Sequence, residues 1–215
     1  FRRVLFRSGG SVTAVQHYWS LSVEEQFYAF WPLLMISAAF MARKFRQPAT
    51  RMLGLAVGGI LVGSLAYSVY ETSISPSWAY FITPTRVWEL AAGGSLALAS
   101  SRFSASPPVR SLASWAGLGL IGVSAVGFSG ATPFPGYLAV VPVSGAFLVI
   151  WAGMPTGVSP APFFRWRFTQ WVGDISYSIY LWHWPLIILT PLVLHGPGYE
   201  LPVLLRPLPV LAALP

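Results

Sequence analysis

The sequence predicts an all-α integral membrane protein, built as a bundle of six complete transmembrane helices with a truncated seventh. Two observations favour this fold class. Of the 215 residues, 55% are hydrophobic and only 9% are charged, whereas soluble domains carry about 25% charged residues. The apolar residues also gather into segments of the length that crosses a bilayer, with short polar connections between them. A soluble protein of six buried helices fits this charge content poorly.

Six apolar segments and the start of a seventh make up the predicted bundle. They cover residues 22–42, 52–70, 84–100, 111–128, 137–152 and 172–194, and the truncated segment begins at residue 201. Proline, glycine, serine or charged residues fill the connections and favour turns there. In the second segment, Gly54 with Gly58 and Gly59 with Gly63 have the GxxxG spacing that lets two membrane helices approach closely. We therefore expect close helix packing along this segment.

Basic residues occupy alternate connections. Those at 43–51, 101–110 and 153–170 contain Arg or Lys, whereas those at 71–83, 129–136 and 195–200 contain none. Because basic residues concentrate in cytoplasmic loops, the alternation predicts a multi-pass membrane protein whose basic connections are cytoplasmic. It places residues 17–26 at the outer face. It also accounts for the net charge of +7 without nucleic-acid binding, since the sequence has no basic helix with interleaved aromatic residues.

Both ends of the sequence differ from the rest. Residues 1–8, FRRVLFRS, resemble a translated sequencing adapter, so we expect a non-native segment there and, over 9–215, the C-terminal portion of a transmembrane domain. The chain has no initiator Met and its last apolar segment stops early, which predicts an internal fragment of a longer protein. The absence of cysteine excludes disulfides and thiolate chemistry.

The segment HYWSLSVEEQFYAFWPLL, residues 17–34, carries two adjacent carboxylates at its polar end. Ser22 and Glu25 match an S-x-x-E capping box, which would give Glu25 a structural role at a helix N-terminus. Glu24 has no such explanation. At 100° per residue Glu24, Tyr28 and Trp31 lie within roughly 60° of one another on one helical face. Glu24 is therefore the acid that the sequence points to as a site-lining residue.

Other polar groups share the face of Glu24 and Tyr28. His17 and Ser20 join it if the helical turn extends backward, and Pro32 leaves the carbonyl of Tyr28 without its usual helical donor. Because ionisable groups inside a membrane are costly, we expect this face to point into the bundle or into a cavity. The alternative is that Glu24 lies at the interface and pairs with an arginine.

The third segment begins with TRVWELAAGG and contains a second pair of charges. Arg86 and Glu89 stand three residues apart, a spacing that allows an ion pair on one helix. This pair could be purely structural or could orient a site. Arg86 is also a candidate partner for Glu24 across the bundle.

The sixth segment, WVGDISYSIYLWHWPLIIL, places two hydroxyls and an imidazole on one face. Ser176, Tyr180 and His183 are spaced at i, i+4 and i+7, which brings them within about 60° of one another. Pro185 frees the carbonyl of Leu181. A single histidine in a membrane helix can be a satisfied core residue, but its hydroxyl neighbours favour a site-lining role. The sequence contains no G-x-S-x-G elbow, no H-E-x-x-H motif, no phosphate loop and no metal-ligand spacing.

Four stretches occur in the order found in acyltransferase family 3, the membrane O-acetylases of lipopolysaccharide O-antigen, peptidoglycan and other glycans. They are HYWSLSVEEQFYAFWPLL, TRVWELAAGG, TPFPGYLAVVPVSGAFLVIWAG and WVGDISYSIYLWHWPLI, and the resemblance covers residues 17 to about 194. It implies a domain of about ten transmembrane helices. It further implies an acyl-CoA donor in the cytoplasm, usually acetyl-CoA, no bound cofactor and a glycan hydroxyl as extracytoplasmic acceptor. In the subgroup that this chain resembles, an SGNH-type domain often follows.

One departure from the family limits the assignment of roles. The histidine proposed as the family's base, with its companion arginine, belongs to the first membrane helix, and this chain has no counterpart. Catalytic residues are therefore unknown here, and we expect the chain alone to be inactive. The candidates for lining the site are His17, Ser20, Glu24, Glu25, Tyr28, Arg86, Glu89, Ser176, Tyr180 and His183. The alternatives are a transporter or flippase component with a polar relay, and a purely structural membrane scaffold.

Overall fold

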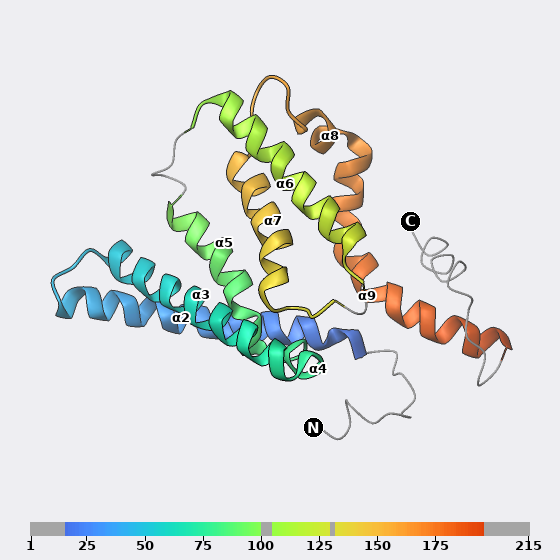
Figure 1. The fold of residues 1–215 in the computed structure, drawn as a ribbon, viewed down its shortest axis with the longest axis horizontal. Helices are drawn as coiled ribbons and strands as arrows, with labels where there is room; N and C mark the ends of the chain where they lie inside the picture. Colours follow the sequence, from blue (N-terminus) through green and yellow to red (C-terminus); the bar gives the residue numbers. More distant parts are fainter. Residues whose placement is uncertain (1–15, 100–104, 130–131, 196–215) are drawn as a thin grey trace. The chain divides into compact units, whose positions relative to one another are not determined.

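The computed structural model describes residues 16–99, 105–129 and 132–195, and all regular structure in these ranges is helical (Figure 1). The chain divides into two compact units. Residues Leu21–Phe164 form one unit, and Phe1–Ser20 with Arg165–Pro215 form the other. The segment at 1–8 and the predicted seventh span from residue 201 lie outside the described residues.

Six long helices coincide with the six predicted segments. They are α2 (Trp19–Lys44), α3 (Ala49–Ile74), α5 (Val87–Ala99), α6 (Pro107–Gly127), α7 (Val140–Ala152) and α9 (Arg167–His195). Shorter elements connect them: η1 (Gln16–Tyr18), α4 (Pro76–Ala79), η2 (Thr83–Thr85), η3 (Tyr137–Ala139) and α8 (Ala161–Arg165). Judged by length and composition alone, α3 and α6 could each cross a membrane. The segments Val87–Ala99 and Tyr137–Ala152 are shorter apolar helices.

The start of α2 corrects the predicted capping box. The 3-10 turn η1 leads directly into α2 at Trp19, so Ser22 lies inside the helix instead of at its N-cap. The Ser22 hydroxyl accepts a hydrogen bond from the Gln26 side-chain amide at 3.3 Å. Because an N-cap residue must precede the first helical turn, Ser22 and Glu25 cannot form the box here, and Glu25 loses its structural explanation.

Large apolar side chains cover the outside of the protein, and small ones fill its interior. The largest fully buried side chains are Val57, Thr85, Pro135, Ser68 and Ser114. Exposed positions include Leu33, Ile36 and Phe40 of α2, each more than 60% exposed. This is the reverse of a water-soluble core and suits helices that pack through small residues while lipid covers the rest.

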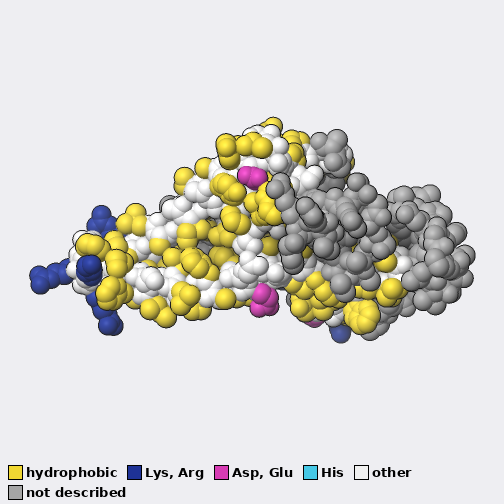
Figure 2. All heavy atoms as spheres, turned by 90° about the horizontal axis from the view of Figure 1, so that it is seen from below, with side chains coloured by type: hydrophobic (Ala, Val, Ile, Leu, Met, Phe, Trp, Pro, Cys, Tyr) yellow, Lys and Arg dark blue, Asp and Glu magenta, His cyan; other side chains and the backbone are white. Residues whose placement is uncertain are grey.

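One view of the surface shows how the charges are distributed (Figure 2). Hydrophobic side chains spread over much of the described part of this face. Lys and Arg side chains gather at the end where α2 turns into α3 in Figure 1. Arg43 and Lys44 occupy the last turn of α2, and Arg46 and Arg51 follow. A basic connection next to an apolar surface is the arrangement that a cytoplasmic loop would have.

Close backbone packing occurs between α6 and α7, not along α3. A Cβ added at Gly117 would lie 2.6 Å from the carbonyl oxygen of Gly145, and one added at Gly145 would lie 2.7 Å from that of Gly117. A Cβ at any of the four GxxxG glycines of α3 would meet nothing within 4 Å. The prediction of close approach through those glycines is therefore wrong for the described residues, and the fully buried positions of α3 are Val57 and Ser68 instead.

Candidate functional site

Five side chains from two distant parts of the sequence meet in one unit, and we call them the histidine cluster: His17, Tyr18, Ser20, Tyr180 and His183. The Tyr180 hydroxyl donates to the carbonyl oxygen of His17 at 2.9 Å. It also hydrogen-bonds with the Ser20 hydroxyl, and either of the two groups can be the donor of that bond. The rings of His17 and His183 lie edge to face, with centroids 5.1 Å apart.

A proline in α9 creates one of the contacts that holds this cluster. Pro185 has no N–H, so the carbonyl of Leu181 receives no donor from within the helix. The Tyr18 hydroxyl donates to that carbonyl at 3.2 Å. The free carbonyl of Leu181 was predictable from the sequence, but its partner was not, since no pattern connects Tyr18 with α9.

The backbone fixes the tautomer of His183. Its Nδ1 lies 2.7 Å from the carbonyl oxygen of Tyr180 and 3.2 Å from that of Ile179. Because a carbonyl can only accept, Nδ1 must carry the proton. In the neutral ring, Nε2 is then left with a lone pair. A lone pair on a correctly oriented imidazole is what a general base requires.

His17 provides two further nitrogen atoms without partners. Both Nδ1 and Nε2 are buried and have no hydrogen-bond partner among the residues that the structure describes. Burial lowers the pKa of the His17 imidazole from its ordinary value of 6.5, and the neighbouring His183 ring lowers it further. The carbonyls of Tyr180 and Leu181 act in the opposite direction. At neutral pH the ring is uncharged and offers one donor and one acceptor.

The second unit contains the arginine cluster, which consists of Tyr80, Arg86, Glu89 and Phe134. Arg86 Nη1 lies 3.5 Å from Glu89 Oε2, and the two side chains are 18% and 25% exposed. The guanidinium carbon lies 4.8 Å from the centre of the Tyr80 ring and 5.4 Å from that of Phe134. The predicted Arg86–Glu89 pair is therefore present, and two aromatic rings that the sequence did not single out stabilise its cation.

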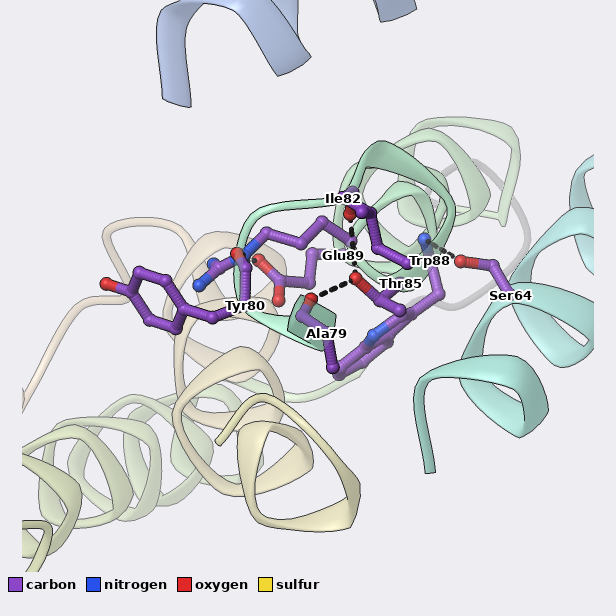
Figure 3. A network of polar contacts seen from close by, with 8 residues as sticks. Ser64, Ala79, Tyr80, Ile82, Thr85, Trp88 and Glu89 are labelled. Carbon is purple, nitrogen blue, oxygen red and sulfur yellow. Dashed lines mark hydrogen bonds and ion pairs between the residues drawn. The ribbon is translucent and has the colours of Figure 1, made fainter. Parts of the chain in front are cut away.

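A buried hydroxyl shapes the turn that leads to Arg86. Thr85 is fully buried, and its hydroxyl lies 2.5 Å from the carbonyl oxygen of Ala79 and 2.7 Å from that of Ile82 (Figure 3). It therefore ties η2 to the end of α4. The turn that carries Arg86 is fixed from inside the protein.

A serine from α3 caps the start of α5. The Ser64 hydroxyl accepts a hydrogen bond from the Trp88 backbone N–H at 3.0 Å (Figure 3) and donates to the carbonyl of Pro84 at 2.6 Å. The first N–H groups of a helix have no partner within the helix, so a side chain from another helix here replaces a local N-cap. This contact positions Glu89, one residue further along.

The remaining candidates lie on exposed surfaces. Glu24, Glu25 and Tyr28 are exposed on α2, and neither acid has an ion-pair or hydrogen-bond partner in the described ranges. The Glu24–Arg86 pair is thus not formed, and the expectation that this face points into the bundle is not met by the described helices. Of the predicted stripe Glu24, Tyr28 and Trp31, only Trp31 packs inward, where its indole lies 2.9 Å from where a Cβ at Gly94 would be, and Val23 is buried on the inward side of the helix.

Ser176 also lies apart from the histidine cluster. It is exposed on α9, and its hydroxyl donates to the carbonyl of Gly173 in its own helix at 2.7 Å. Its predicted face is shared with Tyr180 and His183, but an exposed turn of helix separates it from their contacts.

A groove of about 570 Å³ lies between α2, α3 and the start of α5. Phe27, Phe30 and Ile60 give it an apolar lining, and the Thr83 hydroxyl donates to the Gln26 side-chain oxygen at 2.8 Å. Such a lining can hold an apolar chain but supplies no acid or base. No group of three or more His, Cys, Asp or Glu residues able to hold a metal ion exists within the described part of the chain.

Comparison with known proteins gives this arrangement a context. The model of the acyltransferase domain family named Acyl_transf_3 matches residues 5–214. The chain belongs to this acyltransferase family. OatA of Listeria monocytogenes, a peptidoglycan O-acetyltransferase, is 31% identical over 201 residues, which cover 88% of this chain and 31% of OatA. No solved structure matches the chain.

Two further relatives belong to the same group of matches. YrhL of Bacillus subtilis, provisionally named a peptidoglycan O-acetyltransferase, is 33% identical over 196 residues, covering 86% of this chain and 30% of YrhL. BcsY of Komagataeibacter xylinus, provisionally named a membrane-bound transacylase, is 29% identical over 203 residues, covering 84% of this chain and 44% of BcsY. The chain thus spans less than a third of the length of YrhL and OatA and less than half of the length of BcsY.

Proposed function

We propose that this chain is part of a membrane-embedded O-acetyltransferase that moves an acyl group from acyl-CoA to a hydroxyl of an extracytoplasmic glycan. The observation that carries the proposal is the family match over residues 5–214, supported by the similarity to a peptidoglycan O-acetyltransferase. The apolar exterior and the basic end of the α2–α3 connection support a multi-pass arrangement in the bacterial inner membrane. In this arrangement the six predicted segments cross the bilayer, with η2 preceding α5 and η3 preceding α7 to lengthen those two segments.

The two clusters supply the groups that this chemistry needs. Acyl transfer to a sugar requires a base for the hydroxyl and positive charge or N–H donors for the oxyanion. The histidine cluster contains the imidazoles of His17 and His183. The arginine cluster contains the Arg86 guanidinium, which pairs with the Glu89 carboxylate. We propose the residues of each cluster, taken separately, as candidates for lining the site, with Glu24, Glu25, Tyr28 and Ser176 as further candidates on exposed faces.

The acyl donor in this proposal is a substrate, acetyl-CoA or another acyl-CoA, and no resident cofactor is needed. The chain alone is expected not to complete the reaction, because the family's proposed base lies in a helix for which this sequence has no counterpart. A C-terminal SGNH-type domain in the full-length protein is a further expectation from the family.

Acetyl transfer by a full-length protein that contains this chain tests the proposal. Membranes from cells expressing it are supplied with acetyl-CoA labelled in the acetyl group, and the label in membrane glycan is counted after hydrolysis of O-esters by mild base. Base-labile label above that of membranes lacking the protein supports the proposal. Residues 9–215 expressed alone are expected to give no such label. Transport of unlabelled glycan without acetylation would instead establish the transporter alternative.

A further inference from the structure

Four exposed cations lie where α2 turns into α3 (Figure 2), and we call them the basic connection: Arg43, Lys44, Arg46 and Arg51. No carboxylate lies within ion-pair distance of any of them among the residues that the structure describes. Arg51 Nη1 donates to the Gln47 side-chain oxygen at 2.8 Å, but an amide carries no charge. The four positive charges are therefore not compensated by this unit.

The charge-free lengths of α2 and α3 place the basic connection at the level of lipid headgroups. Arg43 lies eighteen residues beyond Glu25, a rise of about 27 Å along α2. Glu71 lies twenty residues beyond Arg51, a rise of about 30 Å along α3. No Asp, Glu, Lys or Arg lies between the members of either pair. Because the hydrocarbon core of a bilayer is about 30 Å thick, helices that cross it hold the basic connection at the membrane surface.

Arg46 occupies a backbone position that glycine suits better. At the end of α2, the Arg46 N–H donates to the Arg43 carbonyl at 3.3 Å, and the Gln47 N–H donates to the Ala42 carbonyl at 2.9 Å, which is the Schellman pattern. Arg46 has a φ of 53°, and it is the only residue other than glycine with a positive φ in the described ranges. This conformation is strained for an L-residue. The backbone gives no reason for an arginine here, so the reason lies in its side chain.

Arg51 also stands where its own helix disfavours a cation. α3 begins at Ala49, so Arg51 belongs to the first turn, whose free N–H groups make that helix end positive. The N-cap residue, Pro48, offers these N–H groups no side-chain acceptor. Arg43 and Lys44, by contrast, suit the negative C-terminus of α2. Two of the four cations thus lie at locally unfavourable positions, and an anion beside them would stabilise both.

We propose that the basic connection binds the phosphate groups of anionic phospholipids in the cytoplasmic leaflet. The phosphate supplies the negative charge that Arg46, Arg51 and the N-terminus of α3 lack. The acyl chains of the same lipid meet an apolar surface, since Phe40 of α2, Phe45 of the turn and Leu55 of α3 are each about 60% exposed. A soluble phosphate compound would leave this apolar surface uncovered. The assignment requires the membrane placement of α2 and α3 and does not depend on acyl transfer.

Lipid binding by the full-length protein in detergent micelles tests the proposal. The protein is mixed with equal amounts of phosphatidylglycerol and phosphatidylcholine of the same chain length, and native mass spectrometry measures the Kd of each. We expect wild type to prefer phosphatidylglycerol. Arg46→Gln/Arg51→Gln should bind it about 30-fold more weakly, the effect of two cations near an anionic surface, with no change for phosphatidylcholine.

The matched control removes the same charge from another basic connection. Arg165 and Arg167 are also exposed, and Arg165→Gln/Arg167→Gln should change the affinity for phosphatidylglycerol less than threefold. Equal losses in the two double variants would show a general effect of net charge and would overturn the assignment.

Arg46→Gly separates the side chain from the backbone. Glycine adopts a positive φ without steric cost, so in neutral detergent without added lipid this variant should unfold at the wild-type temperature or above it. It should nonetheless bind phosphatidylglycerol about fivefold more weakly, because one cation is lost. Wild-type affinity in Arg46→Gly would contradict the role given to Arg46.

The phosphates of acyl-CoA are the other source of this chemistry, and a separate measurement distinguishes them. The KM for acetyl-CoA is compared between wild type and Arg46→Gln/Arg51→Gln in vesicles of phosphatidylcholine alone, where we expect equal values. A tenfold rise in this KM, with unaltered affinity for phosphatidylglycerol, would assign the basic connection to the acyl donor and overturn the lipid assignment. Absence of transfer by wild type would overturn the proposed function only, since lipid binding is measured without transfer.

Discussion

The arginine cluster and the histidine cluster differ in how their polar groups are satisfied. In the first, a cation faces one carboxylate oxygen of Glu89 and two aromatic rings, while the other oxygen, Oε1, has no partner in the described ranges. In the second, two imidazole rings meet edge to face, and both nitrogens of His17 have no partner in those ranges. A charge that is already paired mainly fixes structure, whereas an unsatisfied base and donor are available to a ligand. The two clusters therefore call for different experiments.

The clusters also differ in how far apart their members are in the sequence. Tyr80, Arg86 and Glu89 lie within one short stretch, and only Phe134 comes from a later connection. The histidine cluster joins residues 163 positions apart, as in the Tyr18–Leu181 contact. Closing such a long loop costs conformational entropy. The arginine cluster should thus form with its local turn, while the histidine cluster depends on the complete chain.

The largest expected effect is at Arg86. Replacing Arg86 with Leu leaves the Glu89 carboxylate in largely apolar surroundings without its partner. Breaking such a pair from one side costs about 3 kcal/mol when both groups are well buried. We expect a loss of about that size in the free energy of unfolding of the full-length protein, measured by denaturant titration in detergent micelles.

The matched control for this prediction removes both charges. In Arg86→Leu/Glu89→Leu the uncompensated carboxylate is gone, so most of the lost stability should return. If the double variant is as unstable as Arg86→Leu alone, the loss comes from the packing of Arg86 against Tyr80 and Phe134 instead of from Glu89.

A smaller effect is expected from Tyr18→Phe in the histidine cluster. The change removes the hydroxyl that satisfies the Leu181 carbonyl freed by Pro185, and a hydrogen bond of this kind contributes about 1 kcal/mol. The same denaturant titration measures it, with Tyr177→Phe as the control because that tyrosine is exposed. Equal stability of both variants would mean that another group, or water, replaces the Tyr18 hydroxyl.

The sequence predicted the elements better than their contacts. Segment lengths and turn residues located all six long helices, and i,i+3 spacing located the Arg86–Glu89 pair. Both depend on local geometry. The failures were the capping box, which depended on where α2 begins, and the GxxxG prediction, which depended on which face of α3 packs. A motif gives a spacing, but its use depends on which face the remaining chain covers.

The histidine cluster illustrates the same limit. Periodicity put Tyr180 and His183 on one face, and the rule for proline identified the free Leu181 carbonyl. Nothing local connects these residues with His17, Tyr18 or Ser20, since the contact depends on tertiary packing over more than 160 residues. The tautomer of His183 likewise needed the position of the Tyr180 carbonyl. Sequence reasoning could nominate the residues, but not their arrangement.

A pH dependence should distinguish the clusters further. Because the pKa of His17 is lowered in the folded protein, the unfolded chain binds its proton more readily below pH 6.5. The contribution of His17 to the free energy of unfolding is therefore fully present above pH 6.5. It is lost as the pH falls through the pKa of His17 in the folded protein. Among the described residues, the ionisable groups whose rings lie against His17 are Tyr18, Tyr180 and His183, and none of them is a carboxylate that would favour the charged imidazolium.

Thermal unfolding of the full-length protein at pH 5 and pH 7.5 checks this expectation. Wild type should lose more stability at pH 5 than His17→Gln, which cannot titrate at that position. Arg86 and Glu89 remain in both proteins, so their contribution cancels in the comparison. An identical pH dependence of the two proteins would show that burial of His17 does not govern its protonation.

The smallest expected effect is at Glu25, and it tests whether α2 begins at Trp19 or after an N-cap at Ser22. A capping box would make Glu25→Gln destabilising, whereas an exposed side chain within a helix predicts a change within about 0.5 kcal/mol. Glu24→Gln should be equally neutral for stability, since both acids are exposed on α2. The variants should differ only in acetyl transfer, and only if Glu24 lines the site in the full-length protein. A loss above 1 kcal/mol in Glu25→Gln alone would mean that Glu25 has a structural role after all and that Ser22 is the N-cap of α2.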